Sequence, residues 1–364
     1  MARIALCTQA IGSGDAITND VLAMFRLLST LGHECRIFSE CVLNSETPTP
    51  TWPIEEAQRF LRSSDSILIL HFGLRWDAGI ELLKTARCRK VFRYHNVTPP
   101  ELFEGVNSGY ENACRIGKAQ AAAAAALGTD LFLPNSQFSV DELIFHGAPP
   151  RQCHVVPPFH QADLLYEADA DLSVLDHLND GSVNLLTVGR VSPNKGHPLL
   201  IDAFAAYYQL YQPNSRLIIT GGIDPALLAY LAQLREQIRR RRVISRVVFA
   251  GKVSLAALKA HYLAAGVFLV GSRHEGFCVP LVEAMRLRVP VVGFGCPAVR
   301  ETLGDAGLLW ETEDPILLAA SIHRVASDQW LTQRLTEAGF NRYASRFSDN
   351  RIQECFLESL QGLL

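Results

Sequence analysis

The 364-residue sequence lacks the features that mark several large classes of protein. It has no apolar run of the about 18 residues that a membrane-spanning helix needs. Its formal net charge of −3 gives no broad basic field of the kind that binds nucleic acid. The N-terminal apolar stretch is interrupted too early, at Gln9, for a signal peptide. These absences favour a cytoplasmic protein with no nucleic-acid partner.

Motifs for disulfides, metals and common nucleotide sites are also missing. The nine cysteines are scattered, are odd in number and form no C-x-x-C pair, which suits reduced thiols. No P-loop is present, and the dinucleotide fingerprint G-x-G-x-x-G is incomplete, because Gly12 and Gly14 are followed by Ile17. No D-x-D metal motif stands at the end of a predicted strand. The incomplete fingerprint argues against a Rossmann dehydrogenase.

What the sequence does contain is an alternation of short apolar strands and amphipathic helices. A chain of this length, with 48 % hydrophobic residues, fits about two α/β domains. Strands are expected at 3–7, 35–38, 66–71, 91–95, 131–134, 155–158, 185–188, 217–220, 247–250, 268–270 and 289–294. Residues 44–53 read as a surface loop. The acidic stretch 159–182 separates the two sets of strands, so we predict domains at 1–165 and 183–345, a linker at 166–182 and a final helix within 346–364.

The stretch 268–287 is the most informative. It reads as a strand, a loop and a helix that begins at Pro280, a favoured first helical residue. The loop 276–279 can aim unpaired backbone N–H groups at an anion. Glu275 lies in this loop and Glu283 in the first helical turn, and carboxylates suit sugar hydroxyls. The alternative is that Glu283 only complements the helix dipole, an effect of about 0.3–1 kcal/mol.

Two basic residues follow the strand that opens the second domain. Arg190 and Lys195 lie in the segment Gly189–Gly196, at the carboxyl end of that strand. An arginine fork can grip a phosphate in two places, and lysine acts as a point charge. The alternative is a solvated basic pair.

Polar residues also follow strands of the first domain. His95 ends one strand, and Asn135 and Ser136 end the next. In an open α/β sheet, ligands bind at this edge. The alternatives are a hydrogen-bonded structural histidine, helix capping by Asn135 and Ser136 or by Ser139, and a simple tight turn at Gly12 and Gly14.

The central stretch resembles a known family. Its pattern S-x-x-E-G-F-x-x-P-x-x-E-A-M is similar to the E-x7-E signature of retaining glycosyltransferases of family 4, and the matching residues are Ser272, Glu275, Gly276, Phe277, Pro280, Glu283, Ala284 and Met285. The segment at Arg190 and Lys195 resembles the family's G-R-x-x-x-x-K-G. One departure is Cys278-Val279, where Gly-Leu is usual.

The resemblance implies a GT-B fold, in which two Rossmann-like, doubly wound parallel-sheet domains face each other across a cleft and the last helix crosses back to the first domain. It implies that the second domain binds a nucleotide sugar, the first binds the acceptor, and no metal or separate cofactor takes part. Catalytic roles fall to His95, Arg190, Lys195 and Glu275. Donor-binding roles fall to Gly14, Asn135, Ser136, Gly189, Gly221, Val253, Gly276, Phe277, Cys278, Val279 and Glu283.

The activity implied is retaining transfer of a hexosyl group from GDP-mannose or a UDP-sugar to a saccharide or lipid-linked acceptor, in bacterial surface polysaccharide or glycoconjugate synthesis. Two alternatives stay open, a nucleotide-sugar epimerase of the same fold and a non-catalytic sugar-binding member. The four arginines Arg239–Arg242 are interpreted as solvated side chains near the end of a helix. The alternative is a peripheral contact with acidic lipid headgroups at the inner membrane face. The oligomeric state, the nucleobase, the sugar and the acceptor stay open.

Overall fold

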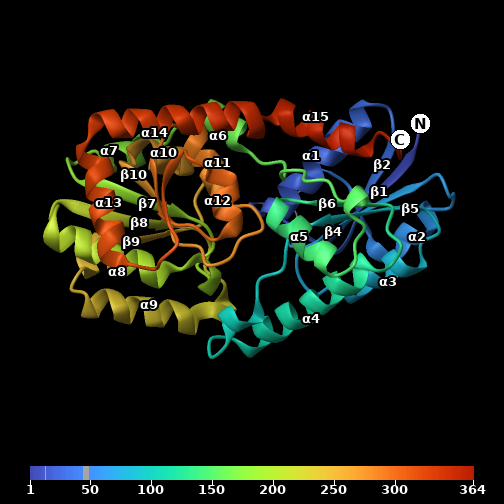
Figure 1. Ribbon diagram of the computed structural model, residues 1–364, viewed down its shortest axis with the longest axis horizontal. Helices are drawn as coiled ribbons and strands as arrows, with labels where there is room; N and C mark the ends of the chain where they lie inside the picture. The colour runs from blue at the N-terminus through green and yellow to red at the C-terminus, as the bar shows by residue number, and fades with distance from the viewer. Residues whose placement is uncertain (13, 44–48) are drawn as a thin grey trace. The chain divides into compact units, whose positions relative to one another are not determined.

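The computed structural model describes residues 1–12, 14–43 and 49–364. The chain forms two compact units (Figure 1). The first unit contains residues 1–101, 109–160 and 349–364, and the second contains residues 102–108 and 161–348. Ser13 of the predicted glycine loop and residues 44–48 of the predicted surface loop lie outside the described residues.

The first unit is built on a six-stranded parallel sheet with the order β3-β2-β1-β4-β5-β6. Its strands are β1 (Arg3–Ile11), β2 (Glu34–Val42), β3 (Thr51–Pro53), β4 (Ile67–Phe72), β5 (Arg89–Tyr94) and β6 (Leu131–Pro134). Its helices are α1 (Ala16–Thr30), α2 (Ala57–Phe60), α3 (Asp77–Thr85), α4 (Ser108–Ala125, which begins at the unit boundary), α5 (Gln137–Phe145) and α15 (Asp349–Leu360). The strand order reverses between β1 and β4.

The core of this unit explains why its strands read as continuous apolar runs. Parallel sheets are covered on both faces, so successive side chains are all buried. One face, with Ile4, Leu6 and Ile69, packs against α1 and against Ile352 and Phe356 of α15. The C-terminal helix therefore belongs to the first unit's core, although the chain reaches it only after the whole second unit.

The second unit repeats the architecture with the strand order β12-β11-β10-β7-β8-β9. Its strands are β7 (Val183–Val188), β8 (Ser215–Thr220), β9 (Val247–Gly251), β10 (Val267–Val270), β11 (Val291–Phe294) and β12 (Gly307–Trp310). Its helices are α6 (Ala162–Glu167), α7 (Leu172–Leu178), α8 (His197–Leu210), α9 (Leu228–Arg240), α10 (Leu255–Ala264), α11 (Val279–Arg286), α12 (Pro297–Leu303), α13 (Pro315–Ser327) and α14 (Gln329–Arg342), followed by a π turn at Tyr343–Phe347. In Figure 1, α8 and α9 lie on one side of the sheet and α10 and α11 on the other.

Three local expectations were wrong. Residues 166–182 are not a bare linker, because they contain the end of α6 and the whole of α7, which Asp171 caps through the N–H groups of Ser173 and Val174. Residues 155–158 form no strand. Val156 donates to the carbonyl of Pro134 at 3.0 Å, but Pro157 and Pro158 have no N–H with which to extend a ladder. Residues 51–53 form the edge strand β3 rather than loop.

No helix among the described residues combines the length and the apolar character needed to cross a membrane.

Candidate active site

The second unit has its strand-order reversal between β7 and β10, which are hydrogen-bonded neighbours. The loops after these two strands are pressed together. A Cβ on Gly196 (φ 64°) would lie 1.8 Å from the carbonyl oxygen of Gly271, so only glycine allows this approach. The N–H of Arg273 donates to the carbonyl of Asn194 at 2.8 Å and locks the two loops. Reversal points of this kind are where open α/β sheets bind ligands.

Loop contact brings two of the predicted catalytic residues together. The Lys195 Nζ donates to Glu275 Oε1 at 2.6 Å, and Ser272 Oγ donates to the same oxygen at 2.7 Å. Burial alone would lower the pKa of Lys195, but the Glu275 carboxylate outweighs it and raises that pKa. Lys195 and Glu275 line a cavity of about 10 Å³, close to the volume one water needs. Lys195 therefore stays protonated, and the Glu275 carboxylate neutralises its positive charge.

Arg190 differs from Lys195 in its surroundings. Its side chain is exposed, and within the described part of the chain it makes no hydrogen bond or ion pair. Glu275 balances Lys195, whereas the charge of Arg190 has no partner among the residues that the structure describes. A ligand with negative charge would restore the balance.

The start of α11 completes the anion-binding features. The helix begins at Val279, so Pro280 is its second residue rather than the first that the sequence predicts. The backbone N–H groups of Gly276, Phe277 and Cys278 have no acceptor among the residues that the structure describes. Cys278 adopts φ 88° and ψ 69°, a left-handed conformation that disfavours any side chain. Cys278, which replaces the family's usual glycine, therefore occupies a backbone conformation that glycine adopts without strain.

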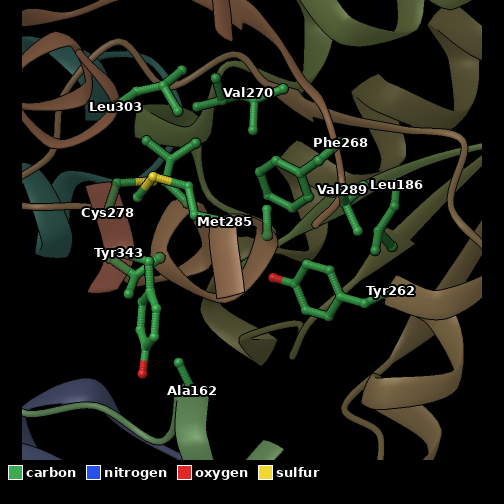
Figure 2. Packing of buried hydrophobic residues seen from close by; sticks show 14 of the residues in the cluster. Ala162, Leu186, Tyr262, Phe268, Val270, Cys278, Met285, Val289, Leu303 and Tyr343 are labelled. Atoms are coloured by element: carbon green, nitrogen blue, oxygen red, sulfur yellow. The ribbon is translucent and has the colours of Figure 1, made fainter. Parts of the chain in front are cut away.

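Glu283 lies in α11 and has a separate partner. Tyr262 Oη donates to Glu283 Oε2 at 2.7 Å, and burial raises the pKa of this carboxyl while the Tyr262 hydrogen bond opposes the rise. Tyr262 stacks on Phe268, with ring centroids 5.8 Å apart (Figure 2). Sequence reasoning missed Tyr262, because it is 21 residues from Glu283 and lies in another helix.

The remaining predicted residues of the second unit lie along the same sheet edge. A Cβ on Gly221 (φ 152°) would meet the carbonyl oxygen of Gly189 at 1.9 Å, and the Gly221 N–H donates to Gly251 at 2.8 Å. Gly189 and Gly221 thus allow the ends of β7, β8 and β9 to converge. Val253 follows β9 and is partly exposed.

The first unit has a buried ion pair at the carboxyl ends of its strands. Arg93 Nε donates to Asp20 Oδ2 at 2.8 Å, and both side chains are 0 % exposed. Arg93 Nη1 also donates to the carbonyl of Val156 at 2.6 Å, and the N–H of Phe159 donates to Asp20 Oδ1 at 2.8 Å. Burial alone would raise the pKa of Asp20, but Arg93 and the two nearby histidines outweigh it and lower that pKa.

His95, predicted as catalytic, lies against this pair. Its Nε2 is 3.1 Å from His71 Nδ1, and its Nδ1 is 3.2 Å from Asn135 Nδ2. Both ring nitrogens therefore have protein partners, and Asn135 is a direct neighbour as well as a predicted site residue. Burial lowers the pKa of His71 to about 4 and moves the pKa of His95 well below its ordinary value, so both rings are neutral near pH 7.

Ser136 and Gly14 have other surroundings. Ser136 is the N-cap of α5, accepting from the N–H of Ser139, so the capping alternative holds for Ser136 and the cap is not Ser139. Gly14 (φ 78°) lies in the loop after β1, which is consistent with the tight-turn alternative.

Sequence reasoning missed Asp20, Arg93 and His71. The signal was available for Asp20, which falls on the same helical face as the apolar Val21 and Met24. It was available for Arg93, a charge between the apolar Phe92 and Tyr94 of β5. A charge at a buried position is costly unless it is paired, so each of the two residues predicts a partner.

The cluster of Asp20, His71 and His95 is relevant to the expectation that no metal takes part, because these residues could bind an ion. Within the described residues, Asp20, His71 and His95 offer ligand atoms that all lie within 4.8 Å of one another. Their chemistry would suit a zinc-like ion. However, Asp20 Oδ2 already accepts from the Arg93 guanidinium, and a divalent cation there would lie beside a buried positive charge. The residues therefore fit an internally balanced cluster better than a metal site.

Comparison with known proteins agrees with this architecture. Residues 176–342 match the family described as Glycosyl transferases group 1. The mannosylfructose-phosphate synthase of Agrobacterium fabrum is 27 % identical over 337 residues, covering 85 % of this chain and 72 % of that protein. The D-inositol 3-phosphate glycosyltransferase of Geodermatophilus obscurus is 30 % identical over 243 residues, covering 65 % of this chain but only 52 % of that protein.

A solved structure matches over the full length. The crystal structure of Anabaena Alr3699/HepE in complex with UDP and glucose has a TM-score of 0.80 and 18 % identity, and the match covers 100 % of both chains. At this identity the likeness concerns the fold. Residues 176–342 belong to the glycosyl transferases group 1 family, and the chain that carries them is a glycosyltransferase with the two-domain GT-B fold.

Proposed function

We propose that this glycosyltransferase moves a hexosyl group from a nucleotide-diphosphate sugar to a saccharide or lipid-linked saccharide, with retention of anomeric configuration. The candidate donors are GDP-mannose and UDP-sugars. A relative named for mannosyl chemistry supports the first, and the neighbour solved with UDP and glucose supports the second. We assign the reaction to bacterial surface polysaccharide or glycoconjugate synthesis.

One observation carries the proposal. At the reversal point of the second sheet, Lys195 and Glu275 balance each other at 2.6 Å, while Arg190 and the N–H groups before α11 have no partner of their own among the described residues. Fixed cations and backbone dipoles aimed at one place stabilise charge that develops on a leaving group. A departing nucleoside diphosphate supplies that charge.

The assigned roles follow from these positions. Arg190 and Lys195 hold the diphosphate, together with the N–H groups of residues 276–279. Glu275 has two donors on Oε1, so sugar hydroxyls would bond to its other oxygen. Glu283, held by Tyr262, accepts from the ribose diol. Neutral His95 contacts the transferred sugar near its reacting carbon.

The transfer step needs no covalent enzyme intermediate. The acceptor hydroxyl oxygen bonds to the anomeric carbon on the face from which the phosphate leaves. As the bond from that carbon to the β-phosphate oxygen breaks, the hydroxyl proton passes to a phosphate oxygen. Since the protein's own cations meet the charge of the leaving group, we propose that the reaction needs no metal.

A donor panel tests the proposal. Purified protein is screened by thermal shift with GDP-mannose, UDP-glucose and ADP-glucose, because ligand binding raises apparent stability. The stabilising donor is then incubated with saccharide acceptors, and products are identified by mass spectrometry and NMR with and without chelator. We expect α-linked product from an α-donor in both cases. Inverted product, a requirement for added metal, or an epimerised donor without acceptor would each contradict part of the proposal.

A further inference from the structure

The peptide group that joins Phe277 to Cys278, just before α11, is held from the neighbouring helix. Thr302 Oγ1 donates to the carbonyl oxygen of Phe277 at 2.6 Å. Thr302 is 1 % exposed and lies near the end of α12, which packs against α11 (Figure 1). A hydroxyl has one proton to donate, and here that proton goes to the Phe277 carbonyl.

Holding the carbonyl determines where the adjoining N–H points. This peptide is trans, and in a planar trans peptide the C=O and the N–H point in opposite directions. Since the Phe277 carbonyl faces α12, the Cys278 N–H is directed away from that helix. It has no acceptor among the described residues, and Cys278 lines the cavity that Lys195 and Glu275 share. Thr302 thus sets the direction of one backbone donor at this edge of the sheet.

Backbone strain at Cys278 gives this hydrogen bond a purpose. Cys278 has φ 88°, which is unfavourable for any residue with a side chain. Turning the peptide over by about half a turn would change the sign of that φ and relieve the strain. It would also take the carbonyl away from Thr302 and point the N–H toward α12. The Thr302 hydroxyl therefore opposes a relaxation that the backbone favours, and a glycine, which adopts either sign of φ, would not need it.

Both partners of this hydrogen bond are anchored from outside the loop. Arg342 Nε donates to the carbonyl of Thr302 at 2.7 Å, and its Nη2 donates to the carbonyl of Glu301 at 2.6 Å. The Phe277 ring packs edge-to-face on Phe347, with centroids 5.4 Å apart and an interplanar angle of 81°. The hydroxyl and the carbonyl are therefore brought together by the packing of α12, α14 and the turn after it.

We propose that Thr302 is a positioning residue that keeps the Cys278 N–H directed at the donor diphosphate by preventing the Phe277–Cys278 peptide from turning over. This rests on the proposed function, in which the N–H groups of residues 276–279 hold the diphosphate. Thr302 acts through one peptide group and does not touch the ligand. Its hydroxyl compensates for the lack of a glycine at position 278.

The test compares two substitutions of Thr302. Thr302→Val removes the hydroxyl and keeps the branched shape, whereas Thr302→Ser keeps the hydroxyl. Thr332→Val is the matched control, because Thr332 Oγ1 donates to the carbonyl of Val325 at 2.5 Å between α14 and α13. Calorimetric titration with UDP, GDP and ADP gives the dissociation constants, at a temperature where every variant is folded.

We expect Thr302→Val to weaken binding of the preferred diphosphate about tenfold, and Thr302→Ser and the control to weaken it less than about threefold. In a Cys278→Gly background, Thr302→Val should weaken binding less than about threefold, because glycine holds the native φ without strain. A loss below threefold for Thr302→Val alone, or an equal loss in the two backgrounds, would overturn the proposal.

A second measurement needs no ligand. The dipeptide Phe-Cys occurs once in the chain, at 277–278, so labelling phenylalanine carbonyls with 13C and cysteine nitrogens with 15N gives one NMR correlation from this peptide. We expect that correlation to be displaced or broadened in Thr302→Val and close to native in Thr302→Ser. A native position and width in Thr302→Val would refute the positioning role. If none of the three diphosphates binds the native protein, the proposed function fails, while this spectrum still decides the role of Thr302.

Discussion

The carboxyl edges of the two sheets both carry charged side chains, but they differ in whether those charges are balanced within the protein. In the first unit, Asp20 and Arg93 are 0 % exposed, and their charges cancel beside neutral histidines. In the second unit, Lys195 is 21 % exposed and is cancelled by Glu275, while Arg190 lies in solvent with its charge unbalanced. The first edge is therefore a closed cluster suited to orienting a ring. The second has a positive charge to spare and suits a ligand that brings negative charge.

The largest effect is expected from opening the closed cluster. Arg93→Met leaves the Asp20 carboxylate buried and unpaired, so the free energy of unfolding should fall by about 3–5 kcal/mol in urea titrations at pH 7. Lys195→Met should cost less than half as much, because Lys195 and Glu275 both keep contact with solvent. An equal loss in the two variants would remove the distinction between the edges.

The open edge should affect chemistry more than stability. Arg190→Ala should lower turnover about a hundredfold, by analogy with losing one donor that stabilises a developing anion. Its unfolding free energy should change by less than about 0.5 kcal/mol, since the side chain is exposed. Lys195→Ala should lower turnover by a similar factor but also reduce stability. Steady-state kinetics on the reacting donor decide this, and a change below threefold for Arg190→Ala would disprove its role.

Glu283 tests whether the second unit reads the nucleotide's ribose. Glu283→Ala should weaken donor binding by about 1.5–3 kcal/mol, the usual value of a charge-assisted hydrogen bond. Tyr262→Phe removes only the group that holds the carboxylate, and should cost about 0.5–1.5 kcal/mol. Calorimetric titration with the nucleoside diphosphate gives both values. Unchanged affinity in Glu283→Ala would refute the ribose role.

Acid sensitivity should appear at both edges but from separate groups. The pKa of His71 in the first unit and of His197 in the second is about 4, because burial disfavours the charged ring. The unfolded chain takes up these protons near pH 6.5, so stability should fall as pH drops from about 6.5 to 4. His71→Asn should reduce this slope and leave the parts due to His95 and His197. The lowered pKa of Asp20 acts only below about pH 3.8, so it does not overlap. Urea unfolding at pH 7, 5.5 and 4.5 is the measurement, and a slope unchanged in His71→Asn would contradict it.

The smallest effect concerns backbone strain at the open edge. Cys278 holds φ 88°, which costs an L-residue about 1–2 kcal/mol. Cys278→Gly should therefore be more stable than Cys278→Ala by about 1 kcal/mol, the reverse of the usual order within a helix or strand. Both variants lack the Cys278 sulfur, so the difference between their thermal unfolding temperatures reports the backbone strain. Alanine equal to or better than glycine would show that the loop relaxes.

The sequence by itself determined the parallel α/β architecture and most of the second unit's edge. Continuous apolar strands, the segment around Arg190 and the pair of glutamates are local patterns, and a parallel sheet brings the ends of its strands to one edge. For this reason Lys195 and Glu275, 80 positions apart, could be expected to meet.

Only the tertiary structure decided which side chains pair with one another at each edge. It paired Asp20 with Arg93 across 73 positions, engaged both nitrogens of His95, turned Ser136 to capping and left Arg190 unbalanced. It also folded the supposed linker into helices and placed α15 in the first unit's core. Side-chain pairing depends on distances between elements that the spacing of residues along one element does not encode. Burial then decides which charges must find a partner within the protein and which stay ready for a ligand.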